Sequence, residues 1–135
     1  MAMRDEYELG YFQTVEELVH ANTFASFIDM AQHLIKQGYK DAAGVIVGSI
    51  LEQHIRQLCR KNSILPEYDG KFQKAEALNV SLANNNIISK LDQKNITAWL
   101  GLRNNAAHGN YGEYNIEQVR LMLSSVQDFI TRHPA

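Results

Sequence analysis

Hydrophobic residues recur along most of this chain at spacings of three and four, which is the pattern of helices that bury one face. The pattern predicts four long helices and one short helix, which begin near Thr14, Asp41, Phe72, Asp92 or Asn95, and Asn115. No stretch requires a strand. A chain of 135 residues is the size of one domain. We therefore expect an all-α fold, an up-and-down bundle of four long helices plus one short helix, with residues 1–135 forming a single domain.

Capping residues support the predicted helix ends. Side chains that can cap a helix stand at Thr14 (with Glu17 at the capping-box spacing), Asp41, and Asn115 (with Gln118 at the same spacing). Gly38 is expected to end the first helix, after about Gln37, in a left-handed conformation. The short helix should run from about Phe72 to Ala83 and end at the asparagines that follow.

The first two predicted helices differ in how much of their surface should be buried in the core. The second helix is apolar over more than half its circumference and should be the most buried element. Its Gly44 and Gly48 share one face and should let a neighbouring helix pack closely. The first helix carries a broad apolar stripe that consists of Val15, Leu18, Val19, Phe24, Ala25, Phe27, Ile28, Ala31, Leu34 and Ile35.

Composition narrows the class of protein. The longest apolar run, Ala42 to Leu51, is about half of what a bilayer span requires, and the first residues form no hydrophobic leader. We therefore expect a cytoplasmic protein with no membrane partner. Cys59 is the only cysteine, which leaves no disulfide framework and no cysteine-based metal site.

The charge of the chain argues against bulk electrostatic binding of nucleic acid. The net charge is -2, so any such site must come from a local cluster or from pairing two chains. A solvated face is the expected role of the basic residues near the ends of the first two helices, Lys36, Lys40, Arg56, Arg60 and Lys61. Structural or solvated roles are expected for His20, His33, His54 and His133, and the chain shows no metal motif or phosphate loop. We expect no cofactor.

The segment "RNNAAHG", residues 103–109, concentrates polar chemistry at the end of a helix. If the helix runs to Ala107, Arg103 and His108 are about 1.4 turns apart, and Asn104 lies one turn before His108. Gly109 should then end the helix and leave His108 projecting from its rim.

This combination suits phosphate chemistry. An arginine offers a permanent charge and a fork of donors that match a phosphoryl group, and a histidine can accept or donate a proton near neutral pH. Attack of a ribose 2′-hydroxyl on its own 3′-phosphate uses both and needs no metal. In the competing interpretation, Arg103 pairs with an acidic residue on a neighbouring helix, and Asn104 and His108 cap the helix end.

The stretch "LRNNAAHGNY" resembles the signature of the HEPN superfamily, an arginine, a polar residue that is commonly asparagine, and a histidine near the end of a helix in an all-α bundle. Arg103, Asn104 and His108 fit that spacing. The resemblance implies a metal-independent endoribonuclease that acts as a homodimer, with both motifs in one cleft. Relatives include toxins with an antitoxin protein partner and phage-defence effectors. Others are inactive modules that bind nucleotide, RNA or a partner protein, which is our alternative function.

Two further residues enter through the resemblance. An acidic residue on the second helix often holds the motif arginine in such bundles, so we expect a contact between Glu52 and Arg103, although a purely structural ion pair would give the same contact. Tyr111 is expected to stack on a base or to pack over the motif. One HEPN subgroup is regulated by modification of a tyrosine where this chain has Asn110, so we do not expect that regulation.

Overall fold

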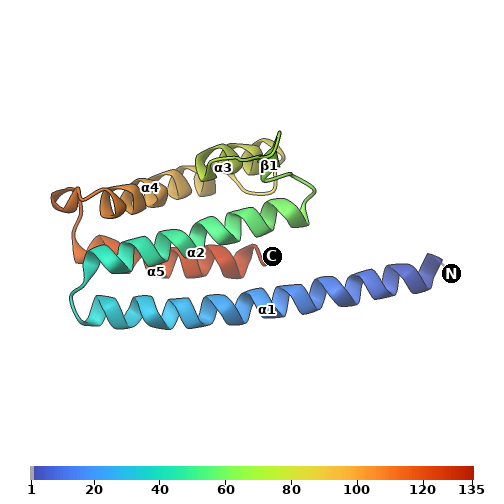
Figure 1. The fold of residues 1–135 in the computed structure, drawn as a ribbon, viewed down its shortest axis with the longest axis horizontal. Helices are drawn as coiled ribbons and strands as arrows, with labels where there is room; N and C mark the ends of the chain where they lie inside the picture. Colours follow the sequence, from blue (N-terminus) through green and yellow to red (C-terminus); the bar gives the residue numbers. More distant parts are fainter. Residues whose placement is uncertain (1) are drawn as a thin grey trace.

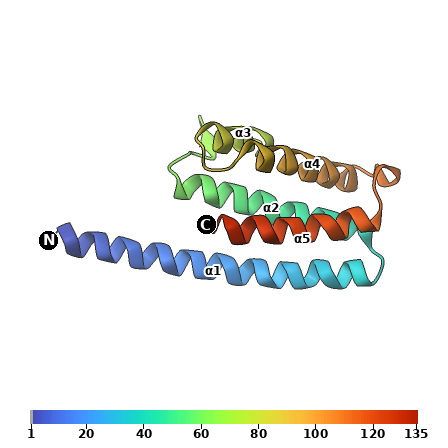
Figure 2. The same ribbon diagram turned by 180° about the vertical axis from the view of Figure 1, so that it is seen from behind.

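The computed structural model describes the backbone of residues 2–135 and the side chains of residues 15, 17–67 and 69–135. Five α-helices form the body (Figure 1): α1 (Ala2–Lys36), α2 (Lys40–Lys61), α3 (Ala75–Asn84), α4 (Lys90–Ala107) and α5 (Ile116–Arg132). The four long helices, α1, α2, α4 and α5, lie side by side, and each runs in the opposite direction to the long helix before it in the chain (Figures 1 and 2). Helix α1 extends past the end of α2. The fold is all-α, as the periodicity predicts.

Helix α2 is the centre of the bundle, because it contacts each of the other four helices. Its buried residues are Ala43, Gly44, Val47, Gly48, Ile50, Leu51, His54, Ile55, Leu58 and Cys59. This confirms that the second helix is the most buried. Gly44 also has its predicted role, because a Cβ at this position would lie 3.2 Å from the Cβ of Ala106 in α4.

Several predicted helix starts are wrong. Helix α1 begins at Ala2, so the chain is already helical where the Thr14–Glu17 capping box was expected. Helix α2 begins at Lys40 after Tyr39, which makes no capping hydrogen bond, so Asp41 lies in the first turn instead of at the cap. Helix α4 is capped by Ser89, whose side chain accepts the N–H of Asp92.

The predicted helix C-termini are confirmed, because they depend on left-handed backbone conformations that few residues other than glycine adopt. Gly38 follows α1 with φ +84, as predicted, and Gly109 follows α4 with φ +81. Asn115 and Gln118 form the predicted capping box of α5 in both directions.

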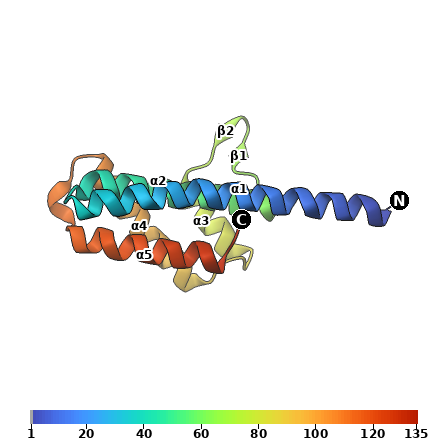
Figure 3. The same cartoon turned by 90° about the horizontal axis from the view of Figure 1, so that it is seen from below.

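The segment before α3 contains a hairpin in place of the first turn of the predicted helix. Strands β1 (Glu67–Tyr68) and β2 (Lys71–Phe72) pair antiparallel, with Glu67 opposite Phe72. Asp69 and Gly70 make the turn with φ values of 52 and 72, the left-handed conformations that a two-residue Asp-Gly turn requires. The hairpin projects from the helices (Figure 3). Phe72 therefore belongs to a strand, and α3 begins three residues later at Ala75.

The predicted apolar stripe of the first helix is only partly buried. Phe24, Ala31 and Ile35 are in the core, whereas Val15, Leu18, Val19 and Phe27 are between 38% and 61% exposed. Helix α1 packs on α2 and α5, and nothing in the described part of the chain covers its opposite side. Over that same part of the chain, no helix combines the length and the hydropathy that crossing a bilayer requires.

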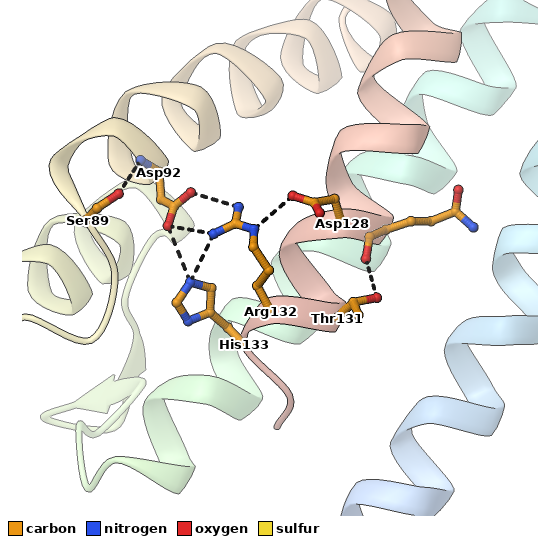
Figure 4. A network of polar contacts seen from close by, with 7 residues as sticks. Ser89, Asp92, Asp128, Thr131, Arg132 and His133 are labelled. Atoms are coloured by element: carbon orange, nitrogen blue, oxygen red, sulfur yellow. Dashed lines mark hydrogen bonds and ion pairs between the residues drawn. The ribbon is translucent and has the colours of Figure 1, made fainter.

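The C-terminal segment is fastened to two helices by polar contacts. Arg132 donates to both carboxylate oxygens of Asp92 in α4, at 2.9 and 3.2 Å, and Nε2 of His133 lies 3.3 Å from the same carboxylate (Figure 4). Nε2 of His54 in α2 donates to the carbonyl oxygen of His133 at 2.6 Å. These contacts hold the end of α5 against α2 and α4.

His54 is completely buried and its tautomer follows from its partners. Because the carbonyl of His133 can only accept, Nε2 of His54 carries the proton, and Nδ1 accepts from Nε2 of His20 in α1 at 3.3 Å. Burial lowers the pKa of His54 to about 4, against a smaller opposing effect of the hydrogen bond to His133. His54 is therefore a neutral core histidine at physiological pH, as expected from its sequence context.

Candidate functional site

Arg103 extends from α4 across the surface of α2, and a glycine makes its path possible. A Cβ at Gly48 would overlap the Cβ and Cγ atoms of Arg103, so only glycine leaves room for the stem of this side chain. The face of α2 that carries Gly44 and Gly48 continues, four residues at a time, to Glu52 and Arg56. The guanidinium of Arg103 is thereby directed toward Glu52.

The predicted contact between Glu52 and Arg103 is confirmed. Nη1 of Arg103 donates to Oε2 of Glu52 at 2.8 Å, and the two side chains are 21% and 24% exposed. Nη2 of Arg103 donates to no described residue, and Nε is buried without a partner there. One guanidinium nitrogen is therefore held by Glu52, while the side chain keeps an exposed edge.

A second arginine shares the same carboxylate. Nη2 of Arg56 donates to Oε1 of Glu52 and to the carbonyl oxygen of Gln73, both at 2.9 Å. Burial raises the pKa of Glu52, but the hydrogen bonds and charges of Arg56 and Arg103 outweigh burial, so the net pKa lies below its usual value. Two permanent cations facing one carboxylate leave this group with a local charge of +1.

Arg56 is the residue that the sequence interpretation missed. We predicted a solvated basic face for the cluster that contains it, yet its side chain is only 13% exposed. Its place four residues after Glu52, on the row that contains both glycines, is the signal that could have identified it. The guanidinium carbon of Arg56 also lies 5.4 Å from the centroid of the Phe72 ring, on the hairpin.

Asn104 and His108 occupy the other end of the candidate site. The side-chain amide of Asn104 lies 3.5 Å from a carboxylate oxygen of Glu76 in α3, and its backbone carbonyl accepts the N–H of His108 at 3.0 Å. His108 is the C-terminal cap residue of α4 and is exposed, with no side-chain hydrogen bond to any described residue. The predicted rim position of His108 is thus confirmed, but the Asn104 side chain points to α3.

The loop after the motif is fixed to the start of α2. Nζ of Lys40 donates to the carbonyl oxygens of Tyr111 and Tyr114, and the hydroxyl of Tyr114 donates to Asp41. Tyr111 lies in the short helix η1 (Tyr111–Glu113) and is half exposed. If a Cβ were added to Gly109, the Tyr111 ring would lie 3.9 Å from it. Tyr111 therefore lies beside the turn that ends α4, and its two expected roles, stacking on a base or packing over the motif, stay predictions.

The helix separates Arg103 from His108 within one chain. Five residues correspond to about 7.5 Å along the axis and about 140° around it. Helical geometry therefore places the two side chains on different faces of α4. A groove of about 1040 Å³ lies between α1 and α2, over an apolar floor that includes Phe24 and Ile50, and the motif contributes no residue to it.

The chemistry available at this site is that of cations, an amide and an imidazole. In the residues whose side chains are described, no group of three or more His, Cys, Asp and Glu residues is placed to hold a metal ion. Arginine and histidine at a helix end can bind an anion and transfer a proton, which requires an exposed edge on each. Comparison of the chain with protein-family models, curated proteins and solved structures finds no significant match in any of the three.

Proposed function

We propose that this protein is a metal-independent endoribonuclease of the HEPN type, in which a homodimer brings two copies of the Arg103–His108 motif into one cleft. The observation that carries the proposal is the way Arg103 is held. Glu52 fixes one nitrogen of its guanidinium, a second arginine offsets the charge of Glu52, and an exposed edge of Arg103 remains for a phosphate. A toxin or phage-defence role is the biological setting that the resemblance suggests.

The proposed reaction is an internal transfer at phosphorus. The ribose 2′-oxygen forms a bond to the neighbouring phosphorus, the bond from phosphorus to the 5′-oxygen breaks, and a 2′,3′-cyclic phosphate and a 5′-hydroxyl result. His108 of one copy accepts the proton of the 2′-hydroxyl, and the second copy's histidine donates a proton to the leaving 5′-oxygen. Arg103 stabilises the additional negative charge on the phosphoryl oxygens. Asn104 would turn from Glu76 to position His108 or the phosphate.

The requirement for two copies follows from the chemistry of the proton transfers. One histidine cannot act as base and acid in the same step, so the reaction needs two. A second motif related by twofold symmetry supplies the second histidine.

The proposal is tested by measuring the rate at which purified protein in EDTA cleaves a fluorescent RNA oligonucleotide. We expect the wild type to cleave it and His108→Ala to lose at least about a hundredfold in rate, because general acid–base catalysis contributes that much. His33→Ala, which changes an exposed histidine of α1, is the matched control and should cleave at the wild-type rate.

Two other results would overturn the nuclease. Cleavage that persists in His108→Ala would exclude the proposed mechanism. RNA binding that Arg103→Ala weakens, with no cleavage by the wild type, would identify a binding module instead.

A further inference from the structure

The hairpin places an exposed aromatic ring next to the arginine pair. Phe72 is 67% exposed although it is a large apolar side chain. Its ring lies over the guanidinium of Arg56, with 5.4 Å from the guanidinium carbon to the ring centroid. Through Glu52, that guanidinium is joined to Arg103 by hydrogen bonds of 2.9 and 2.8 Å. Phe72 is therefore coupled to the candidate site by a continuous set of contacts.

The base of the hairpin is held in place, so this position of the ring is not that of a loose loop. The backbone N–H of Gln73 donates to the carbonyl of Pro66 at 2.8 Å, and the Gln73 side chain donates to the carbonyl of Leu65 at 2.9 Å. The carbonyl of Gln73 in turn accepts from Arg56. Arg56 therefore fixes the strand that carries Phe72 while its own guanidinium lies under the ring.

The surroundings of Phe72 suit a nucleotide. Lys71 and Lys74 flank the ring along the chain, Glu67 stands opposite it in the hairpin, and Asp69 lies at the turn, so the exposed charges of residues 67–74 balance while the two lysines lie nearest to the ring along the chain. Aromatic rings and arginine planes bind unpaired bases by stacking, whereas a base inside a duplex is already stacked on its neighbours. An exposed ring backed by a guanidinium and bordered by lysines therefore favours single-stranded RNA.

We propose that Phe72, backed by Arg56, is a stacking platform for an unpaired base, and that it makes the site specific for single-stranded RNA. This inference rests on the proposed function, which places the cleaved phosphate at Arg103. Glu52 and the guanidinium of Arg56 stand between Arg103 and the Phe72 ring. The stacked base accordingly belongs to a nucleotide next to the phosphate that Arg103 binds or farther along the RNA.

The binding arm of the test uses full-length protein that carries His108→Ala, so that binding is measured apart from cleavage. The probe is a single-stranded RNA octamer with one 2-aminopurine, whose fluorescence falls on stacking. We expect Phe72→Ala to weaken octamer binding about tenfold and to abolish the quenching. Phe72→Trp should restore both. Leu121→Ala, which removes an equally exposed apolar side chain from α5, should bind like the parent protein.

The cleavage arm compares substrates of different length in the presence of His108. Phe72→Ala should slow cleavage of the octamer more than cleavage of a dinucleotide, because the octamer offers additional bases that can stack on the ring. Octamer binding by Phe72→Ala that equals the parent's, or an equal loss in Leu121→Ala, would overturn the platform and leave the nuclease untouched. Quenching that depends on Phe72, in a wild-type protein that cleaves no RNA, would support the platform and overturn the nuclease.

Discussion

Glu52 decides what both arginines of the candidate site can do. Its two carboxylate oxygens are divided between Arg103 and Arg56, so neither arginine is neutralised by a carboxylate of its own. Removing the carboxylate would leave two cations close together and partly buried, which is costlier than losing an exposed ion pair. The Glu52–Arg103 contact thus has both a structural and a functional consequence.

A double-mutant cycle with Glu52→Gln and Arg103→Gln measures the structural part. We expect a coupling energy of about 2 kcal/mol in the free energy of unfolding from urea titrations, since the pair is mostly shielded from water. The exposed pair of Glu117 and Arg120 on α5 is the matched control and should show no measurable coupling. A Glu52–Arg103 coupling as small as the control's would mean that Glu52 does not hold the arginine in solution.

Because His54 is buried in its neutral form, we expect the protein to lose stability in mild acid. Its pKa is about 4 in the folded protein, below its ordinary value of 6.5, because burial disfavours the charged ring. The unfolded chain therefore binds more protons between these values, and stability falls as pH drops from about 6.5 toward 4. The difference between the two pKa values corresponds to a loss of about 3 kcal/mol in the free energy of unfolding. His20, whose pKa burial also lowers, acts in the same direction.

Urea unfolding of the wild type at several pH values between 7.5 and 4.5 tests this expectation. His54→Gln should be less stable at neutral pH, because the hydrogen bonds to His20 and His133 change, but should lose much less stability on acidification. His33→Gln, on the exposed face of α1, should keep the wild-type pH dependence. If His54→Gln and the wild type lose stability in parallel, His54 is not the group that titrates. Asp92 and Glu52, with lowered pKa values, contribute only at lower pH.

At the scale of the elements, the close crossing of α2 and α4 sets the geometry of the site. Gly44 and Gly48 let Ala106 and Arg103 approach α2, and this approach brings the guanidinium to Glu52. Gly101 of α4, by contrast, has open space where a side chain would be. These glycines therefore have opposite predicted responses to the same substitution.

We expect Gly48→Ala to lower the free energy of unfolding by about 2 kcal/mol, because the added methyl group displaces the stem of Arg103. Gly101→Ala should raise it by about 1 kcal/mol, because alanine favours the helix and meets no neighbour. Thermal and urea unfolding of the two variants measure both effects. A stable Gly48→Ala protein with wild-type RNA affinity would show that Arg103 does not need this path.

The helices were predictable because their evidence is repeated many times along the chain, whereas their starting points depend on single residues. Thr14 with Glu17 is a valid capping pair that the structure does not use, since α1 continues back to Ala2. Ser89 is the cap that was overlooked. The hairpin was not predicted, although an Asp-Gly pair such as Asp69 and Gly70 between two short strands is its usual signal. The apolar residues that follow fitted a helix equally well.

The candidate site was predictable where the residues are close in sequence. Arg103, Asn104 and His108 were found from their spacing, and Glu52 was found from the resemblance together with its place on a buried helix. Arg56 and Phe72 escaped, because their relation to Arg103 exists only after α2, the hairpin and α4 have packed together. The direction of the Asn104 side chain toward Glu76 depends on α3 in the same way.

At the scale of the whole molecule, the proposed nuclease requires two chains. The rate of RNA cleavage per chain should therefore fall when the protein is diluted below the dissociation constant of the dimer, which analytical ultracentrifugation measures. Gly101→Ala, which leaves the described contacts unchanged, should follow the wild-type dilution curve. A rate per chain that stays constant into the monomeric range would exclude a composite site.

The most direct test of the central claim is the chemical nature of the cleaved ends. Mass spectrometry of an RNA oligonucleotide incubated with the protein in EDTA should find 2′,3′-cyclic phosphate and 5′-hydroxyl ends, and neither should form with His108→Ala. A 2′-deoxy nucleotide at the cleavage position should block the reaction, because the attacking hydroxyl is missing. Products with 5′-phosphate ends, or uncleaved RNA with the dimeric wild type, would contradict the assignment of Arg103 and His108 as the catalytic pair.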